Sequence, residues 1–424
     1  MRALRLYSRA DSAAMSGIRR GRQYLDFTAG VAVNALGHAD DKFVAAMTSQ
    51  GMSLTHSSNV FYNAWATELA ELLISLTQRE GGLGFEPGSN SSSGVAADTK
   101  VFFANSGTEA NEGAFKFARK VGKDRWAAAH GKNADDAACS KWRFACFEHS
   151  FHGRSMGSLS ATANKKYQAP FAPLVPGFDV GKVNDVDGLK ELVTEDTCGV
   201  IVEPIQGEGG IFAVDVEWLR ALRKRCDQVG AVLIYDEIQC GLYRTGDLWA
   251  HSKMPVDCHP DIVTMAKPLA NGFPIGAVMM RDAIAETMTP STHGTTFGGS
   301  PLACALGHHV LSRLSESTFT ASVQAASIHL RERLESLPHW FPKLVSAEGV
   351  RGRGLMLGIP FVSDRAAHAP SELVRMSRER GVLLLTAGSD AVRLVPSLIV
   401  KPEEIDHAAD VIESVLGKMH NELA

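Results

Sequence analysis

The stretch Asp261-Ile-Val-Thr-Met-Ala-Lys267-Pro-Leu-Ala-Asn-Gly-Phe-Pro-Ile-Gly276 holds a short apolar run that ends at a lysine and is followed at once by proline. Such a run, rich in β-branched residues and closed by a breaker, predicts a buried strand that leads into a loop. Lys267 then lies at the carboxyl end of a strand, where open α/β sheets bind ligands. Apolar surroundings turn a lysine into a nucleophile. This stretch alone, however, favours an ordinary surface lysine.

Two further apolar runs end in acids, namely Gly199-Val-Ile-Val-Glu203 and Ala231-Val-Leu-Ile-Tyr-Asp236. The segment between them has apolar residues at helical spacing: Trp218, Leu219, Leu222 and Cys226. Continuously apolar strands separated by a helix predict a mostly parallel sheet with helices on both faces. Glu203, Asp236 and Lys267 then share one edge of that sheet.

A phosphate-binding turn is predicted after another strand, Val101-Phe-Phe-Ala104. The turn Asn105-Ser106-Gly107-Thr108 leads into a helix that begins near Glu109. Free backbone N–H groups, two hydroxyls and the positive end of the helix dipole suit a phosphate group there. A plain helix N-cap is the alternative, and the turn by itself favours it.

Taken together, these features match the requirements of pyridoxal phosphate. Its aldehyde needs an amine, which Lys267 provides, and its ring nitrogen needs a carboxylate, which Asp236 provides. The phosphate needs the N–H donors of the turn at Ser106. The face of the ring needs an apolar cover, for which Phe151 in Ser150-Phe-His-Gly-Arg154 is the candidate.

Long sequence strings carry a resemblance to a known family. They are Phe103-Ala-Asn-Ser-Gly-Thr-Glu-Ala-Asn-Glu112, Phe151-His-Gly-Arg154, Val202-Glu-Pro-Ile-Gln-Gly-Glu-Gly-Gly210, Asp236-Glu-Ile-Gln-Cys-Gly-Leu-Tyr-Arg-Thr-Gly246, Ala266-Lys-Pro-Leu-Ala-Asn-Gly272 and Gly294-Thr-Thr-Phe-Gly-Gly299. In this order they resemble the class III, fold-type I aminotransferases, and most closely the acetylornithine aminotransferases. The resemblance runs from about Tyr24 to the C-terminus.

The resemblance implies a role for each cofactor contact. Lys267 corresponds to the lysine that bonds covalently to pyridoxal 5'-phosphate and moves the proton in each half-reaction. Asp236 corresponds to the partner of the ring nitrogen, Gln239 to the residue near the ring hydroxyl, and Phe151 to the stacking aromatic.

For the phosphate, the resemblance implies a cradle of Ser106, Gly107 and Thr108. Thr296 corresponds to a phosphate ligand that reaches in from the other subunit. The resemblance therefore implies a homodimer with its active site at the subunit interface.

For the substrates, Arg154 corresponds to the arginine that binds the α-carboxylate, and Thr295 to a further contact. Glu203 and Arg393 resemble a switchable ion pair that hides the arginine from a δ-amino donor and frees it for 2-oxoglutarate. The implied reaction converts N2-acetyl-L-ornithine and 2-oxoglutarate to N-acetyl-L-glutamate 5-semialdehyde and L-glutamate, in arginine biosynthesis. The alternatives are an ornithine, succinylornithine or 4-aminobutyrate aminotransferase, or an inactive relative that serves as a binding protein.

The domain organisation follows from the same patterns. We expect an α/β protein of the fold type I of pyridoxal-phosphate-dependent transferases, with a large domain around the mostly parallel sheet and a smaller C-terminal α+β domain. The expected segments are a transit peptide or basic arm at 1–22, an N-terminal segment at 23–60, the large domain at 61–300 with surface inserts at 81–98 and 130–140, and the small domain at 301–424. The resemblance implies a strand ahead of Tyr24, whereas here that arm is shortened.

Composition narrows the classes of partner. The 424 residues are 45% hydrophobic and carry a formal charge of −4, which favours small-molecule substrates over nucleic acid, and no apolar stretch approaches a membrane span. Seven scattered cysteines and the pair His149 and His152 give no metal-ligand spacing. The leader, rich in arginine and poor in acids, predicts the mitochondrial matrix, with the cytoplasm as the alternative.

Overall fold

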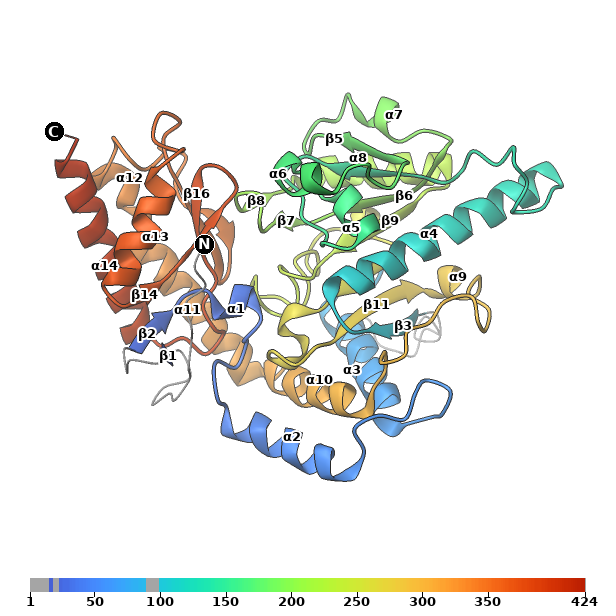
Figure 1. Cartoon of the computed structure of the whole chain (residues 1–424), viewed down its shortest axis with the longest axis horizontal. Helices are drawn as coiled ribbons and strands as arrows, with labels where there is room; N and C mark the ends of the chain where they lie inside the picture. Colours follow the sequence, from blue (N-terminus) through green and yellow to red (C-terminus); the bar gives the residue numbers. More distant parts are fainter. Residues whose placement is uncertain (1–14, 18–22, 89–98, 424) are drawn as a thin grey trace.

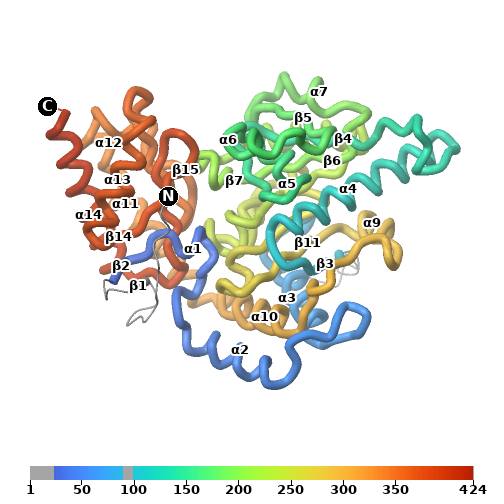
Figure 2. Tube along the Cα trace, in the orientation of Figure 1, coloured from blue at the N-terminus to red at the C-terminus, as the bar shows by residue number. Residues whose placement is uncertain are grey.

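The computed structural model describes residues 15–17, 23–88 and 99–423. Figure 1 shows a larger body around a central sheet and a smaller body that holds the C-terminal helices, and the same arrangement is clear in the Cα trace of Figure 2. The helix α10 (Pro301–Leu314) lies in the larger body and leads directly towards the smaller one. The predicted architecture is confirmed, whereas the exact domain boundaries stay a prediction.

Within the described residues, seven strands form the central sheet. Their order is β3 (Thr99–Ala104), β11 (Gly276–Arg281), β10 (Ile262–Met265), β9 (Val232–Asp236), β6 (Thr197–Val202), β4 (Arg143–Phe147) and β5 (Phe178–Gly181). The strand β11 is antiparallel to both neighbours, and the other neighbouring pairs are parallel. The carboxyl ends of β6, β9 and β10 therefore meet at one edge, as predicted.

Alternate side chains of these strands enter two separate cores, as the period of two in a strand requires. One face packs against α4 (Gly107–His130), with Ile201 and Ile234 among its buried residues. The other face packs against α8 (Val216–Val229), with Val200 and Leu233. Burial on both faces explains why the strands read as continuous apolar runs.

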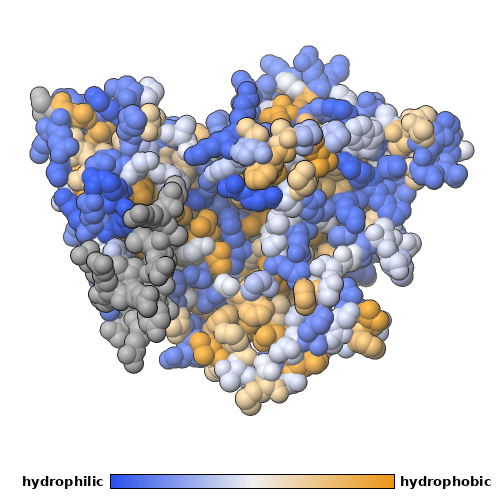
Figure 3. Space-filling view, viewed as in Figure 1, coloured by the Kyte–Doolittle hydropathy of each residue, from blue (hydrophilic) through white to orange (hydrophobic). Residues whose placement is uncertain are grey.

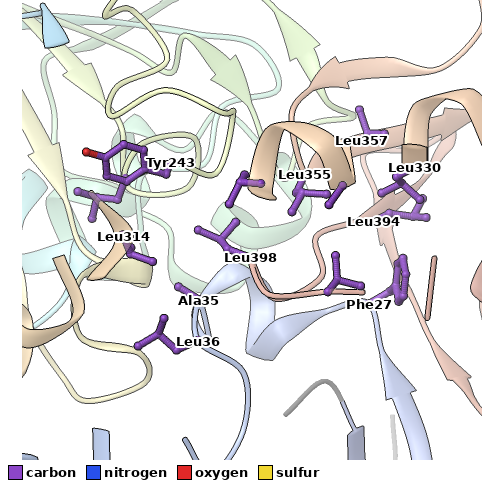
Figure 4. Packing of buried hydrophobic residues seen from close by; sticks show 14 of the residues in the cluster. Phe27, Ala35, Leu36, Tyr243, Leu314, Leu330, Leu355, Leu357, Leu394 and Leu398 are labelled. Atoms are coloured by element: carbon purple, nitrogen blue, oxygen red, sulfur yellow. The ribbon is translucent and has the colours of Figure 1, made fainter. Parts of the chain in front are cut away.

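The smaller body contains a sheet in the order β12 (Arg351–Arg353), β13 (Met356–Pro360), β16 (Ala391–Leu394) and β15 (Leu385–Ala387). It also contains α11 (Ser317–Glu335), α12 (Leu337–Trp340), α13 (Ala369–Glu379) and α14 (Pro402–Asn421). One apolar cluster joins both bodies, because Phe27, Tyr243 and Leu314 belong to the same cluster as Leu357 and Leu394 (Figure 4).

The other helices and strands of the described residues complete the two bodies. The helices are α1 (Ala29–Ala32), α2 (Asp41–Ser53), α3 (Ala64–Glu80), α5 (Met156–Ala161), α6 (Lys165–Gln168), α7 (Leu189–Leu192), α9 (Asp282–Ala285), η3 (Ala169–Phe171), η4 (Val256–Cys258) and η5 (Lys267–Ala270). The strands are β1 (Met15–Gly17), β2 (Gln23–Asp26), β7 (Ile205–Gln206), β8 (Phe212–Ala213) and β14 (Val382–Leu383).

Two local expectations need correction. A strand does precede Tyr24, because β1 pairs antiparallel with β2. The predicted surface insert at 81–98 is wrong at its start, since Leu83 and Phe85 are buried and the Leu83 N–H donates to Nε2 of His251 at 3.2 Å. Residues 89–98 of that insert, and residues 1–14 and 18–22 of the predicted leader, lie outside the described residues.

Candidate active site

Lys267 is the first residue of η5, directly after β10 and Ala266. Burial and, to a smaller extent, the charge of Arg393 lower the pKa of the Lys267 ammonium to about 8, while the Asp236 carboxylate opposes the shift. A lowered pKa makes the neutral amine available near physiological pH. The sequence-based expectation of a strand-end lysine in apolar surroundings matches this geometry.

Asp236, the last residue of β9, is held from three directions. Its Oδ2 accepts a hydrogen bond from Nδ2 of Asn111 at 2.8 Å and lies 2.8 Å from Nδ1 of His152. Its Oδ1 accepts from the Ile238 N–H at 3.0 Å. The carboxylate is buried and charge-assisted hydrogen bonds fix its orientation, so it can pair with a cationic ring nitrogen.

The turn before α4 lies at the same edge. Ser106 is the N-cap, and its Oγ accepts from the Glu109 N–H at 3.3 Å. The helix begins at Gly107, two residues before the predicted start, and Thr108 Oγ1 lies 2.7 Å from Oγ of Ser155. Both predictions for the turn, an N-cap and an anion site, are compatible with this geometry.

A cavity of about 270 Å³ joins these groups. It is lined by Ser106, Gly107, Thr108, Phe151, His152, Gly153, Arg154, Glu203, Asp236, Ile238, Gln239, Ala266 and Lys267. The structure therefore brings together the predicted lysine, carboxylate, helix start and aromatic cover from four separate segments. The combination of an amine, a carboxylate and an anion-suited helix start is the donor set that pyridoxal phosphate requires.

The ion pair of Arg393 is with Glu208 and not with Glu203, so the predicted pair is wrong as a direct contact. Nη2 of Arg393 instead donates to Oε2 of Glu208 at 3.1 Å, and its Nη1 donates to Oε1 of Gln239 at 2.9 Å. Arg393 is buried, and Glu208 is about 30% exposed, so the acid has a path towards solvent.

Glu203 accepts hydrogen bonds from two backbone N–H groups instead of pairing with Arg393. Its Oε1 accepts from the Phe151 N–H at 2.9 Å and its Oε2 from the Gly207 N–H at 3.0 Å. Burial raises the pKa of Glu203. Gly207 itself must approach closely, because a Cβ there would lie 2.2 Å from Nε2 of Gln239. Glu203 therefore ties the loop that bears Glu208 to the segment that bears Phe151.

Arg154 lines the cavity and stacks on an aromatic ring that the sequence did not single out. Its Cζ lies 3.9 Å from the ring centroid of Tyr167, within the range of a cation–π contact. The Tyr167 hydroxyl donates to Oε1 of Glu208 at 2.8 Å. Burial and this hydrogen bond raise the pKa of Tyr167, which keeps the hydroxyl a donor.

Thr295 and Thr296 lie apart from the cavity. Oγ1 of Thr295 accepts from Nδ2 of Asn105 at 3.0 Å, beside the phosphate-suited turn, whereas Thr296 is exposed. Sequence reasoning also missed four residues of the site: Asn111, Ile238, Glu208 and Tyr167. Asn111, Glu208 and Ile238 stand within the quoted strings Phe103 to Glu112, Val202 to Gly210 and Asp236 to Gly246, whereas Tyr167 carries no motif or spacing that marks it.

Comparisons with known proteins identify the family. A model of the family described as aminotransferase class-III matches residues 2–416. The chain belongs to the class III aminotransferases.

Several relatives with a more specific name are similar to this chain over most of its length. Mitochondrial acetylornithine aminotransferases from Neurospora crassa and Yarrowia lipolytica are 48% and 47% identical, over 92% and 93% of this chain and 79% and 87% of those proteins. A crystal structure of N-acetylornithine aminotransferase from Stenotrophomonas maltophilia is 34% identical with a TM-score of 0.77, covering 99% of this chain and 97% of that one. An ornithine aminotransferase from Toxoplasma gondii, with partial occupancy of PLP at its active site, is 28% identical with a TM-score of 0.82, covering 98% and 91%.

Proposed function

We propose that this protein transfers the δ-amino group of N2-acetyl-L-ornithine to 2-oxoglutarate, giving N-acetyl-L-glutamate 5-semialdehyde and L-glutamate, as a step of arginine biosynthesis. The observation that carries the proposal is the buried Arg393 covered by Glu208 beside the cavity that contains Lys267. A covered arginine suits a donor whose reacting end has no carboxylate, and an uncovered one suits an oxo acid with two carboxylates. A relative named for this activity is 48% identical over 92% of this chain.

The cofactor is pyridoxal 5'-phosphate, the cofactor of class III aminotransferases, and the residues present fit it. When bound, it accepts the amino group of the donor and withdraws electrons from the carbon that loses a proton. With the cofactor bound, Asp236 would keep the ring nitrogen protonated, and Phe151 and Ile238, which line the cavity from two different loops, would cover the ring. The turn Ser106 to Thr108 would hold the phosphate, and Gln239 would serve the ring hydroxyl.

Lys267 and Arg154 have different roles in the reaction. Nζ of Lys267 would hold the cofactor, and the same amine would move the proton at the reacting carbon of the substrate. Its lowered pKa suits that work near neutral pH. Arg154 binds the α-carboxylate of the acetylated donor through its planar fork.

Glu208 and Arg393 together adapt the charge of the site to the substrate of each half-reaction. In the first, Glu208 neutralises Arg393, so the δ-amino end enters without meeting a free positive charge. In the second, Glu208 moves away and Arg393 binds the second carboxylate of 2-oxoglutarate. The same cavity thus accepts two substrates of different charge, which a fixed positive site does not.

The second subunit belongs to the same proposal. Five apolar side chains are each more than half exposed: Met52, Val60, Phe61, Tyr62 and Phe297. Phe61 and Tyr62 line a surface pocket together with Gly298, two residues after Thr296. Figure 3 shows apolar side chains spread over the lower part of the molecule, where α2 and α10 lie. Apolar patches of this kind mark interfaces, so we infer a homodimer in which Thr296 completes the phosphate site of the partner.

The place of action is the mitochondrial matrix. The support is the basic leader and the relatives that are named mitochondrial. Among residues 15–17, 23–88 and 99–423, no helix is both long and apolar enough to cross a membrane.

One assay tests the reaction directly. Glutamate formed from N-acetylornithine and 2-oxoglutarate is measured with the purified holoenzyme, in parallel with free ornithine, N-succinylornithine and 4-aminobutyrate as donors. We expect the highest kcat/KM for N-acetylornithine. A higher value for another of these donors would move the proposal to that aminotransferase, and no turnover of any of them would favour a binding protein.

A further inference from the structure

Tyr167 connects the two arginines that are proposed to bind substrate carboxylates. Its ring lies under the guanidinium of Arg154, 3.9 Å from centroid to Cζ, and its hydroxyl donates to Oε1 of Glu208 at 2.8 Å. Oε2 of the same carboxylate accepts from Arg393 at 3.1 Å. Tyr167 therefore contacts Arg154 through its ring and is linked to Arg393 through the carboxylate of Glu208.

The position of Tyr167 makes this contact specific. The residue belongs to the short helix α6 and is half-buried, and its ring meets the Phe151 ring edge-on, with the centroids 6.0 Å apart at 86°. It is thus packed against the segment that carries both Phe151 and Arg154. Its hydroxyl is held in place by this packing and is not a mobile surface group.

We propose that Tyr167 is a specificity-determining positioning residue: its hydroxyl holds Glu208 over Arg393 and thereby sets the preference between donors with an uncharged distal end and oxo acids with a second carboxylate. The inference rests on the proposed function, in which Glu208 covers Arg393 for one substrate and uncovers it for the other.

The energetic argument concerns the two positions of Glu208. In the covering position its two oxygens have one partner each, Tyr167 and Arg393. A dicarboxylate binds Arg393 only after Glu208 has left, which breaks both contacts. Hydrogen bonds to charged groups are the strong ones, so the tyrosine hydroxyl adds to the stability of the covering position alone. Loss of that hydroxyl increases the fraction of molecules in which Glu208 has left Arg393. Only a dicarboxylate needs Arg393 uncovered, so only its affinity should change.

The ring and the hydroxyl have separable effects. Tyr167→Phe keeps the ring under Arg154 and removes only the hydrogen bond to Glu208. Tyr167→Leu removes the cation–π contact as well, so binding of every carboxylate that Arg154 holds should weaken. The two variants therefore predict different patterns, and general damage to the fold predicts neither of them.

The experiment measures binding to the holoenzyme by isothermal titration calorimetry with two probes of equal chain length. Glutarate has two carboxylates, and pentanoate has one. For Tyr167→Phe we expect glutarate to bind about fivefold more tightly, as loss of one charge-assisted hydrogen bond from the covering position implies, with pentanoate unchanged. For Tyr167→Leu we expect both probes to bind more weakly than to Tyr167→Phe. In steady-state kinetics, Tyr167→Phe should lower the ratio of the KM for 2-oxoglutarate to that for N-acetylornithine by a similar factor.

Matched variants control the result. The Tyr243 hydroxyl donates to Oε1 of Glu80 at 2.7 Å, a tyrosine–glutamate hydrogen bond outside the site, so Tyr243→Phe should leave the ratio of the two affinities unchanged. In a Glu208→Gln background, the substitution Tyr167→Phe should have a much smaller effect, because the charged acceptor is already lost. The proposal is overturned if the ratio of the glutarate affinity to the pentanoate affinity is the same in Tyr167→Phe as in the wild type. An equal loss of affinity for both probes overturns it as well.

Failure of the proposed function gives a different result. If wild-type protein turns over another ω-amino donor and not N-acetylornithine, the substrate assignment is wrong, but the glutarate and pentanoate measurements still decide the role of the Tyr167 hydroxyl.

Discussion

Nδ1 of His152 lies 2.8 Å from Oδ2 of Asp236, and both side chains are buried. The same oxygen accepts from Nδ2 of Asn111, whose Oδ1 in turn accepts from Oγ1 of Thr264 at 2.8 Å. The carboxylate is therefore fixed before any cofactor arrives. Such preorganisation is how a protein stabilises charge without reorganising during the reaction.

Replacement of this carboxylate should remove catalysis and leave the fold intact. Asp236→Asn keeps the shape and most of the hydrogen-bonding capacity but loses the negative charge beside the ring nitrogen. We expect kcat to fall by about 10²–10³, the range seen when one preorganised electrostatic group is lost. The glutamate-forming assay measures the loss, and circular dichroism checks the fold. A kcat within tenfold of wild type would argue against the assigned role.

His152 should act through Asp236 and not on the substrate. His152→Ala removes one of the polar partners of Oδ2, so we expect a smaller fall in kcat than for Asp236→Asn, together with an altered visible spectrum of the bound cofactor. Asn111→Ala is the matched comparison, because it removes the other partner of the same oxygen. Spectra unchanged in both variants would show that neither group influences the cofactor through the carboxylate.

Covalent attachment of the cofactor tests Lys267. Borohydride should fix the cofactor to the wild-type protein, seen as a mass increment on the peptide that contains residue 267, and Lys267→Ala should show no increment there. An increment on a different peptide in the wild-type protein would contradict the assignment.

The lowered pKa of Lys267 predicts a pH dependence for reconstitution. Only the neutral amine attacks the aldehyde, and its fraction rises as the pH passes the pKa from below. With a pKa of about 8 instead of the usual value near 10.5, the rate of covalent attachment to the apoprotein should rise between about pH 7 and 9 and then level off. Stopped-flow absorbance measures this rate. A rise that continues up to pH 10 would show that the lysine is not perturbed in the apoprotein.

Two neighbouring acids should give different phenotypes. Glu208→Ala uncovers Arg393, so we expect the preference to shift from the δ-amino donor towards glutamate. Glu203→Ala leaves the N–H groups of Phe151 and Gly207 without their acceptor, so we expect a loss of about 2–4 kcal/mol in the free energy of unfolding. Substrate kinetics and urea denaturation measure the two effects. If Glu203→Ala altered the donor preference and left the stability unchanged, the result would favour the pair of Glu203 and Arg393 that the sequence predicts.

These two acids also show where sequence reasoning reaches its limit. The strand ends at Asp236 and Lys267 are predictable, because apolar runs closed by breakers define them. The bounds of helix α3 also follow local signals in the sequence, since Asn63 caps its start and Gly81 ends it. Glu203 and Glu208 share one string, however, and the choice between them depends on how the chain turns at β7. Tyr167 belongs to a helix of four residues, too short to show a periodicity, and its partners are 13 and 41 residues away in the sequence.

The proposed contribution of Thr296 to the partner's site can be tested with mixed dimers. A Lys267→Ala subunit has an inactive site of its own but offers an intact Thr296 to its partner. A Thr296→Ala subunit keeps its lysine and receives that threonine, so each mixed dimer should contain one native site. At limiting pyridoxal phosphate, where a lost phosphate contact weakens cofactor binding, we expect the mixture to regain activity that neither variant shows alone. A mixture no more active than the average of the two separate variants would mean that Thr296 does not act across the interface.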